Sequence, residues 1–197
     1  VLHRFADLID RDGATWALLD TGQMGMPIAQ STGAAPGAAE IVRAAADIAD
    51  KAPDLLIPSA ASAIALQIRR PQGVVAAITP WNYPVHVGLG RIAPALAAGN
   101  SVILKPSEIA PLALLHLAAL ASEAGLPDGV LNALPGRGSV TGKLLALHAD
   151  VDCLAFTGST ATGLMLMHYA SQSNMKALQL ECGGKSPQLV FDDGGDL

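Results

Sequence analysis

The chain has 197 residues, of which 51% are hydrophobic and 4% aromatic, and its formal net charge at pH 7 is −5. This length suffices for one or two domains with a sizeable core, and mild acidity without a basic cluster argues against nucleic-acid binding. Every apolar run is broken well before the roughly 18 residues that a membrane span needs. The two cysteines form neither a disulfide framework nor a metal-binding spacing, and no signal peptide is recognisable, so we expect a cytoplasmic protein.

Helical periodicity dominates the first part of the chain. The predicted elements there are a helix over residues 1–20 broken at Gly13, a loop over 22–27, a helix over 37–51, and a loop marked by Pro53 and Pro58. Residues 63–70 instead alternate apolar and polar side chains, which is typical of a half-exposed strand. Because later strands look fully buried, this strand could pair outside the main sheet.

From residue 73 onward, short buried apolar runs alternate with longer helical runs. Strands are predicted at 74–78, 101–104, 130–134, 153–156, 177–180 and 188–191, and helices at 85–98, 111–124, 138–148 and 164–170. This alternation requires right-handed crossovers and a parallel sheet with helices on both faces. The sequence therefore predicts a Rossmann-like α/β fold.

The stretch from Cys153 to Gly163 predicts a strand that turns through glycine into a helix. Free N–H groups at the start of a helix, together with the helix dipole, favour a bound phosphate. Gly158 would let the backbone approach a pyrophosphate, Ser159 could cap the helix, and Gly163 would let the helix pack closely on the sheet. The spacing G-x-x-x-x-G is not the dinucleotide fingerprint, so an ordinary strand-to-helix turn is an equally good interpretation of this turn alone.

Polar or glycine-rich residues follow several of the predicted strands. They lie at 79–83, 105–108, 136–138, 158–159 and 181–185. Because the carboxyl ends of parallel strands meet at one edge, where such sheets bind ligands, we expect a single site there. The five histidines show no metal-ligand spacing, so no metal is predicted. Gly184-Lys185-Ser186 ends like a phosphate loop, but Gln179 stands where that loop needs glycine.

Four segments, in this order, resemble the signatures of the NAD(P)-dependent aldehyde dehydrogenase superfamily. They are Ile78-Thr79-Pro80-Trp81-Asn82-Tyr83-Pro84, Lys105-Pro106-Ser107-Glu108, Phe156-Thr157-Gly158-Ser159-Thr160 and Leu180-Glu181-Cys182-Gly183-Gly184-Lys185-Ser186-Pro187. The resemblance implies oxidation of an aldehyde to a carboxylic acid. In that reaction a cysteine thiolate attacks the carbonyl, hydride passes to the nicotinamide, and water hydrolyses the thioester.

The resemblance also implies a role for each matched residue. Asn82 would donate its amide to the developing oxyanion, and Glu181 would activate the hydrolytic water. Lys105 and Glu108 would bind ribose hydroxyls, and the Glu108 carboxylate would favour NAD over NADP by repelling a 2′-phosphate. The other residues implied at the cofactor are Ile78, Thr79, Pro80, Trp81, Ser107, Gly138, Gly158, Ser159, Gly163 and Cys182. Apart from the resemblance, Asn82 could cap a loop, Glu181 could be a solvated surface group, and Lys105 and Glu108 could form a surface ion pair.

The resemblance divides the chain into three parts. Residues 1–62 would be a helical part of the cofactor-binding domain, 63–72 a strand used in assembly of a dimer or tetramer, and 73–197 the NAD-binding α/β core. The family nucleophile would lie beyond Leu197, and neither Cys153 nor Cys182 matches it. We therefore expect a fragment that does not turn over aldehydes by itself. The alternative is a non-catalytic nucleotide-binding or interaction module that retains the fold; a cysteine encoded downstream would favour the enzyme.

Overall fold

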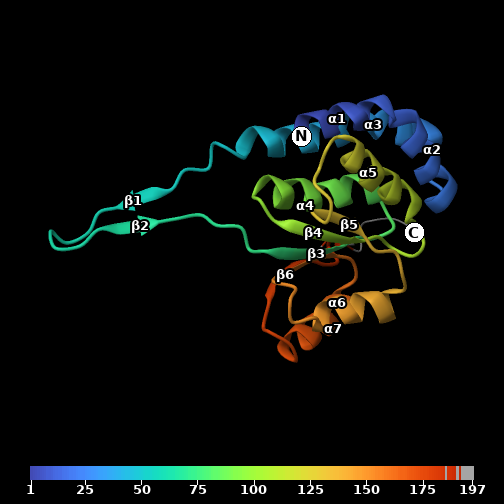
Figure 1. The fold of residues 1–197 in the computed structure, drawn as a ribbon. Helices are drawn as coiled ribbons and strands as arrows, with labels where there is room; N and C mark the ends of the chain where they lie inside the picture. The colour runs from blue at the N-terminus through green and yellow to red at the C-terminus, as the bar shows by residue number, and fades with distance from the viewer. Residues whose placement is uncertain (185, 190, 192–197) are drawn as a thin grey trace.

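The core of the molecule is a five-stranded parallel sheet, seen in a computed structural model that describes residues 1–184, 186–189 and 191 (Figure 1). Its strands are β3 (Val74–Ile78), β4 (Ser101–Lys105), β5 (Leu131–Ala133), β6 (Cys153–Thr157) and β7 (Ala177–Glu181). They lie in the order β5-β4-β3-β6-β7, so the chain moves outward from β3 through β4 to β5 and then crosses to β6 on the other side of β3. The predicted parallel α/β sheet is confirmed, and its switch point lies between β3 and β6.

Helices cover both faces of this sheet (Figure 1). They are α4 (Pro84–Ala97) and α5 (Leu112–Glu123) on one face, and α6 (Lys143–Leu147), preceded by the π-helical turn η1 (Gly138–Gly142), with α7 (Thr160–Ser171) on the other. Alternate strand residues divide between the two faces because side chains along a strand point to opposite sides. Val75 and Ala77 pack with α4 and α5, whereas Ala76 and Ile78 pack on the side of α6 and α7.

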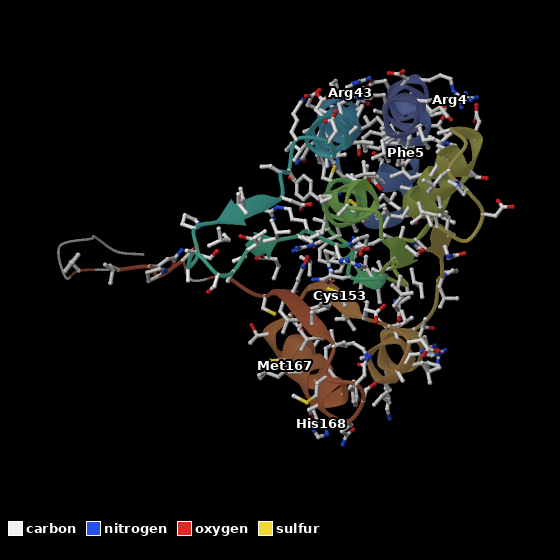
Figure 2. The ribbon with its side chains drawn as sticks, turned by 60° about the vertical axis from the view of Figure 1, so that its left-hand side comes forward. Arg4, Phe5, Arg43, Cys153, Met167 and His168 are labelled. Carbon is white, nitrogen blue, oxygen red and sulfur yellow. The ribbon has the colours of Figure 1, made fainter. Side chains whose placement is uncertain are left out.

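Three N-terminal helices form a further layer over α4 and α5 (Figures 1 and 2). They are α1 (Leu2–Arg11), α2 (Gly13–Met24) and α3 (Ile28–Ile48). Phe5 and Trp16 are buried within this layer, whereas Figure 2 shows Arg4 and Arg43 at its outer surface. The layer and the α4–α5 side of the sheet share one continuous core.

The boundaries predicted in this layer were partly wrong. The expected loop over 22–27 is shorter, because α2 continues to Met24 and ends at Gly25, which has a left-handed φ of 77°. The expected helix over 37–51 begins nine residues earlier, at Ile28, and ends at Ile48. Gly33 and Pro36 disfavour a helix locally, but packing against neighbouring helices buries Ser31, Ala38, Ala39 and Val42 and outweighs that preference.

A two-stranded arm projects from the body between α3 and β3 (Figure 1). Strand β1 (Leu55–Ile57) pairs antiparallel with β2 (Ala65–Gln67), apart from the main sheet. The strand predicted over 63–70 forms only at 65–67, and it pairs outside the main sheet as expected. The loop predicted around Pro53 and Pro58 was wrong in part, because the apolar residues between the two prolines form the partner strand.

The strand predicted over 188–191 is not formed at the described positions 188, 189 and 191, and Val190 lies outside the described residues, as does Lys185 of the last motif. The side chains of Leu189 and Phe191 are exposed, so these two residues do not pack on the sheet. Within the described part of the chain, no helix has the length and apolar character needed to cross a bilayer.

Candidate functional site

A cavity of about 690 Å³ opens at the carboxyl ends of β3, β4, β6 and β7. It lies at the switch point of the sheet, where neighbouring crossovers leave in opposite directions and open a crevice. The predicted site residues that line it are Ile78, Thr79, Pro80, Trp81, Asn82, Lys105, Ser107, Glu108, Gly138, Gly158, Ser159, Glu181 and Cys182. Of the predicted set, Gly163 alone is not in the lining. The structure thus brings residues from five separate segments to one rim.

Lys105, the last residue of β4, is buried in the wall of this cavity, with 2% of its surface exposed. Its Nζ donates to the carbonyl of Pro106 at 2.8 Å. Burial lowers the pKa of Lys105, and the nearby Glu108 carboxylate opposes that effect. An ammonium has three N–H donors, and the described residues accept from only one of them here. The remaining donors are suited to hydroxyl oxygens of a ligand.

Glu108 lines the cavity and is hydrogen-bonded to another residue of its wall. One of its oxygens, Oε2, accepts a hydrogen bond of 2.8 Å from the backbone N–H of Gly138, at the start of η1. The carboxylate therefore connects the loop after β4 to the turn after β5. Sequence reasoning missed this contact, because it joins residues far apart in the chain. The other carboxylate oxygen remains available to accept from a ligand hydroxyl.

The start of α7 forms the side of the cavity near β6. Ser159 is the N-cap, and its Oγ accepts from the backbone N–H of Thr162 at 3.2 Å. This cap satisfies one of the free N–H groups of the first turn and leaves others for an anion. Gly163 serves packing instead, since a Cβ there would lie 2.7 Å from Sγ of Cys182. That contact explains why Gly163 does not line the cavity.

Asn82 and Glu181 line the cavity from different segments of the chain. Asn82 lies between β3 and α4, is exposed, and finds no side-chain hydrogen-bond partner among the described residues, so its amide is free to donate. Glu181 ends β7 and is the register partner of Thr157 at the end of β6. Arg91 of α4 donates to Thr157 Oγ1 at 3.1 Å. Sequence reasoning missed Arg91, because a lone arginine in a helix carries no motif.

Neither cysteine is placed as a nucleophile. Cys153 is buried in the sheet (Figure 2), and burial, with a smaller effect of Asp152, raises the pKa of its thiol. Cys182 lines the cavity, but its sulfur lies against the backbone of Gly163 in α7. A thiol with a raised pKa, or one held against a helix, is poorly suited to attack a carbonyl near Asn82.

The donor set fits a dinucleotide. The hydroxyl oxygen of Thr79, in the same wall, is buried without a hydrogen-bond partner among the described residues. Together with the free donors of Lys105, it leaves this wall with polar groups that the described residues do not satisfy. The N–H groups at the start of α7 suit a pyrophosphate, and Lys105 with Glu108 suits ribose hydroxyls.

Comparisons with known proteins point to one family. The model of the aldehyde dehydrogenase family matches residues 1–197. The NADP/NAD-dependent aldehyde dehydrogenase PuuC of Escherichia coli K12 is 48% identical over 198 residues, covering 100% of this chain and 40% of that protein. The aminoacetaldehyde dehydrogenase of Pseudomonas aeruginosa is 41% identical over 197 residues, with coverages of 100% and 40%. The chain thus spans about 40% of the length of these curated relatives.

Solved structures show the same fold. The aldehyde dehydrogenase KauB of Pseudomonas aeruginosa superposes with a TM-score of 0.92 at 50% sequence identity, covering 99% of this chain and 40% of that one. An indole-3-acetaldehyde dehydrogenase solved with NAD⁺ superposes with a TM-score of 0.92 at 48% identity, with coverages of 99% and 40%.

Proposed function

Because the chain belongs to the aldehyde dehydrogenase family, we propose that the full-length protein oxidises an aldehyde to a carboxylic acid with NAD(P) as hydride acceptor. The observation that carries this proposal is the single cavity that joins Asn82 and Glu181 to Lys105, Glu108 and the start of α7. The share of the reaction that lies in this chain is cofactor binding, oxyanion stabilisation and activation of water. The attacking thiolate is expected from outside it.

Each residue has a chemical task in this proposal. The Asn82 amide donates to the carbonyl oxygen as negative charge develops there during thiolate attack. When NAD is bound, its nicotinamide accepts the hydride that leaves the carbonyl carbon. Glu181 then takes a proton from the water that attacks the thioester. Both Asn82 and Glu181 lie on loops or strand ends at the rim, where a substrate can reach them.

Cofactor binding is assigned to other residues of the same cavity. Lys105 donates to a ribose hydroxyl, and the second oxygen of Glu108 accepts from one. The α7 N-terminus with Gly158 and Ser159 holds the pyrophosphate, while Ile78, Thr79, Pro80, Trp81, Ser107, Gly138 and the backbone of Cys182 complete the walls. We propose NAD as the preferred cofactor, because the Glu108 carboxylate repels a 2′-phosphate.

Titration calorimetry of the chain with NAD and NADP tests this assignment. Ser159→Trp should weaken NAD binding at least about tenfold, or about 1.4 kcal/mol, by blocking the pyrophosphate seat. Met167→Trp is the matched control, because Met167 projects from the exposed side of α7 (Figure 2). Wild-type affinity in both variants would reject the seat.

The Glu108→Gln variant separates the effect of the Glu108 charge from the effect of its hydrogen bond with Gly138. A glutamine oxygen can still accept from Gly138, so the wall should stay in place while the negative charge is lost. We expect the preference for NAD over NADP to fall about tenfold, equivalent to about 1.4 kcal/mol. Glu108→Ala, which also loses the Gly138 bond, should weaken both cofactors. An unchanged preference in Glu108→Gln would show that Glu108 does not set it.

We also propose that the full-length protein forms a homo-oligomer through the arm. Its exposed apolar side chains include Leu56, Ile64 and Leu66. In this proposal the assembly segment is wider than residues 63–72, because β1 belongs to the same arm. The helices before the arm remain part of the proposed cofactor-binding domain, and the α/β sheet after it remains the proposed NAD-binding core. A cytoplasmic location remains a proposal, supported by two free cysteines.

A further inference from the structure

The backbone at Tyr83 is left-handed, with φ 48° and ψ 48°. L-amino acids rarely adopt this conformation, and among the described residues the other non-glycine example is Met175. Tyr83 lies between Asn82, which lines the cavity, and Pro84, which begins α4. The unusual turn therefore sits where the cavity loop joins its supporting helix.

Helix α3 of the N-terminal layer contacts both this turn and the helix that follows it. The Tyr83 hydroxyl accepts a short hydrogen bond from Nε2 of Gln30 in α3. One turn along α4, a ring nitrogen of His86 lies 3.0 Å from the carbonyl oxygen of Ala34, also in α3. The Tyr83 carbonyl accepts from the N–H of Val87 at 3.0 Å and so starts α4. Both the ring of Tyr83 and the helix after it are thus fixed to neighbouring elements.

Asn82 has no comparable support of its own. Its side chain finds no hydrogen-bond partner among the described residues, so the backbone alone sets the position from which its amide projects. Because α4 is anchored to α3, relaxing Tyr83 to an extended conformation would move the residues before it, Trp81 and Asn82, rather than the helix. The conformation of Tyr83 therefore sets the position and direction of the Asn82 Cα–Cβ bond relative to α4.

We propose that Tyr83 is a positioning residue, whose left-handed backbone, at the start of the helix that His86 anchors to α3, aims the Asn82 amide at the reacting carbonyl. This inference rests on the proposed role of Asn82 as the oxyanion donor. A strained conformation persists only where surrounding contacts enforce it, and such strain gathers at functional sites. Oxyanion donors must be aimed before the charge develops, because a mobile donor contributes less to the transition state.

Two substitutions in the full-length enzyme separate the backbone from the ring. Tyr83→Val removes the ring and adds a β-branched residue that disfavours the left-handed region. Tyr83→Asn also removes the ring but tolerates this region. We expect Tyr83→Val to lower kcat at least about tenfold while KM for NAD stays within about twofold, and Tyr83→Asn to keep kcat within about threefold of the wild type.

Equal losses of kcat in both variants would assign the effect to the ring and overturn the proposal, as would full activity in Tyr83→Val. Crystal structures of the two variants give a second readout without any substrate. The Asn82 amide should be displaced in Tyr83→Val and unmoved in Tyr83→Asn; an unmoved amide in both contradicts the proposal. A wild-type enzyme without activity on any aldehyde would reject the proposed function, and the crystal structures would still decide whether Tyr83 positions Asn82.

Discussion

Asp20 is a buried acid in α2 with no charged partner among the residues that the structure describes. It is 3% exposed, its Oδ1 has no hydrogen bond among the described residues, and burial raises the pKa of this carboxyl from 3.8 to about 6. The folded protein therefore keeps the proton to a higher pH than the unfolded chain does. It follows that Asp20 stabilises the fold most below about pH 4, and that this contribution is lost as the pH rises through about 6.

Asp20→Asn should remove this pH dependence. One pKa unit corresponds to about 1.4 kcal/mol, so the free energy of unfolding of the wild type should fall by at most about 3 kcal/mol between pH 4 and 7 relative to the variant. Urea unfolding at several pH values measures the difference. Asp50→Asn, at an exposed position, is the control and should leave the wild-type profile unchanged. Parallel profiles for wild type and Asp20→Asn would contradict the raised pKa.

The contact between Gly163 and Cys182 is a second residue-scale test. Gly163→Ala places a methyl group 2.7 Å from the Cys182 sulfur and should cost about 1–3 kcal/mol of stability through overpacking. Cys182→Ala in the same chain should relieve most of that cost, giving a coupling energy of about 1 kcal/mol or more in a double-mutant cycle. Gly22→Ala, in α2 with open space around it, should instead stabilise by about 0.5–1 kcal/mol. Additive effects at positions 163 and 182 would refute the close contact.

The positions of the cavity residues could be predicted, but their contacts could not. Lys105 ends the largely buried strand β4, and Glu181 ends β7, whose residues are half-buried or exposed, so the edge that they share follows from the parallel sheet. The bond from Gly138 to Glu108 and the left-handed turn at Tyr83 depend on packing between distant elements. Sequence patterns report local preference and burial, and neither property encodes these tertiary contacts.

At the scale of elements, the arm predicts how the protein assembles. Leu56 and Leu66 are register partners on β1 and β2, and both are exposed in a single chain. Changing both to Glu should prevent burial of this surface, since a charged side chain is costly to bury without a partner. We expect the full-length double variant to have a lower molar mass by light scattering. Leu18→Glu, at an exposed position on α2, should keep the wild-type mass. A wild-type mass for the arm variant would exclude the arm as the interface.

Elements with strong local patterns were predicted well, and elements that depend on a partner were not. The strands β3, β4 and β6 are short apolar runs bounded by turns, and this local pattern predicts them. The first turns of α3 contain Gly33 and Pro36, and they are helical because they pack on other helices. Strand β1 exists because β2 lies beside it. In both cases the deciding interaction lies outside the segment that sequence reasoning evaluates.

At the scale of the whole molecule, the described residues contain part of the proposed catalytic arrangement. Asn82 and Glu181 share the cavity, but Cys153 is buried and the Cys182 sulfur faces Gly163. The purified 197-residue chain should therefore bind NAD without producing NADH from aldehydes. Absorbance of NADH with a panel of aldehydes measures this. Aldehyde-dependent NADH formation that Cys182→Ser abolishes would show that Cys182 is the nucleophile.

The two faces of the sheet are packed against apolar cores of different size. The core on the side of α4 and α5 continues into the N-terminal helices, whereas two small separate clusters lie beneath α6 and α7. Regions with less buried apolar contact open first, so the start of α7 belongs to the half of the molecule that a protease would reach soonest. A ligand bound at the start of α7 requires that region to be folded, and its binding therefore stabilises the region against local unfolding. We therefore expect the lifetime of the protein in a cell to lengthen when its dinucleotide is abundant.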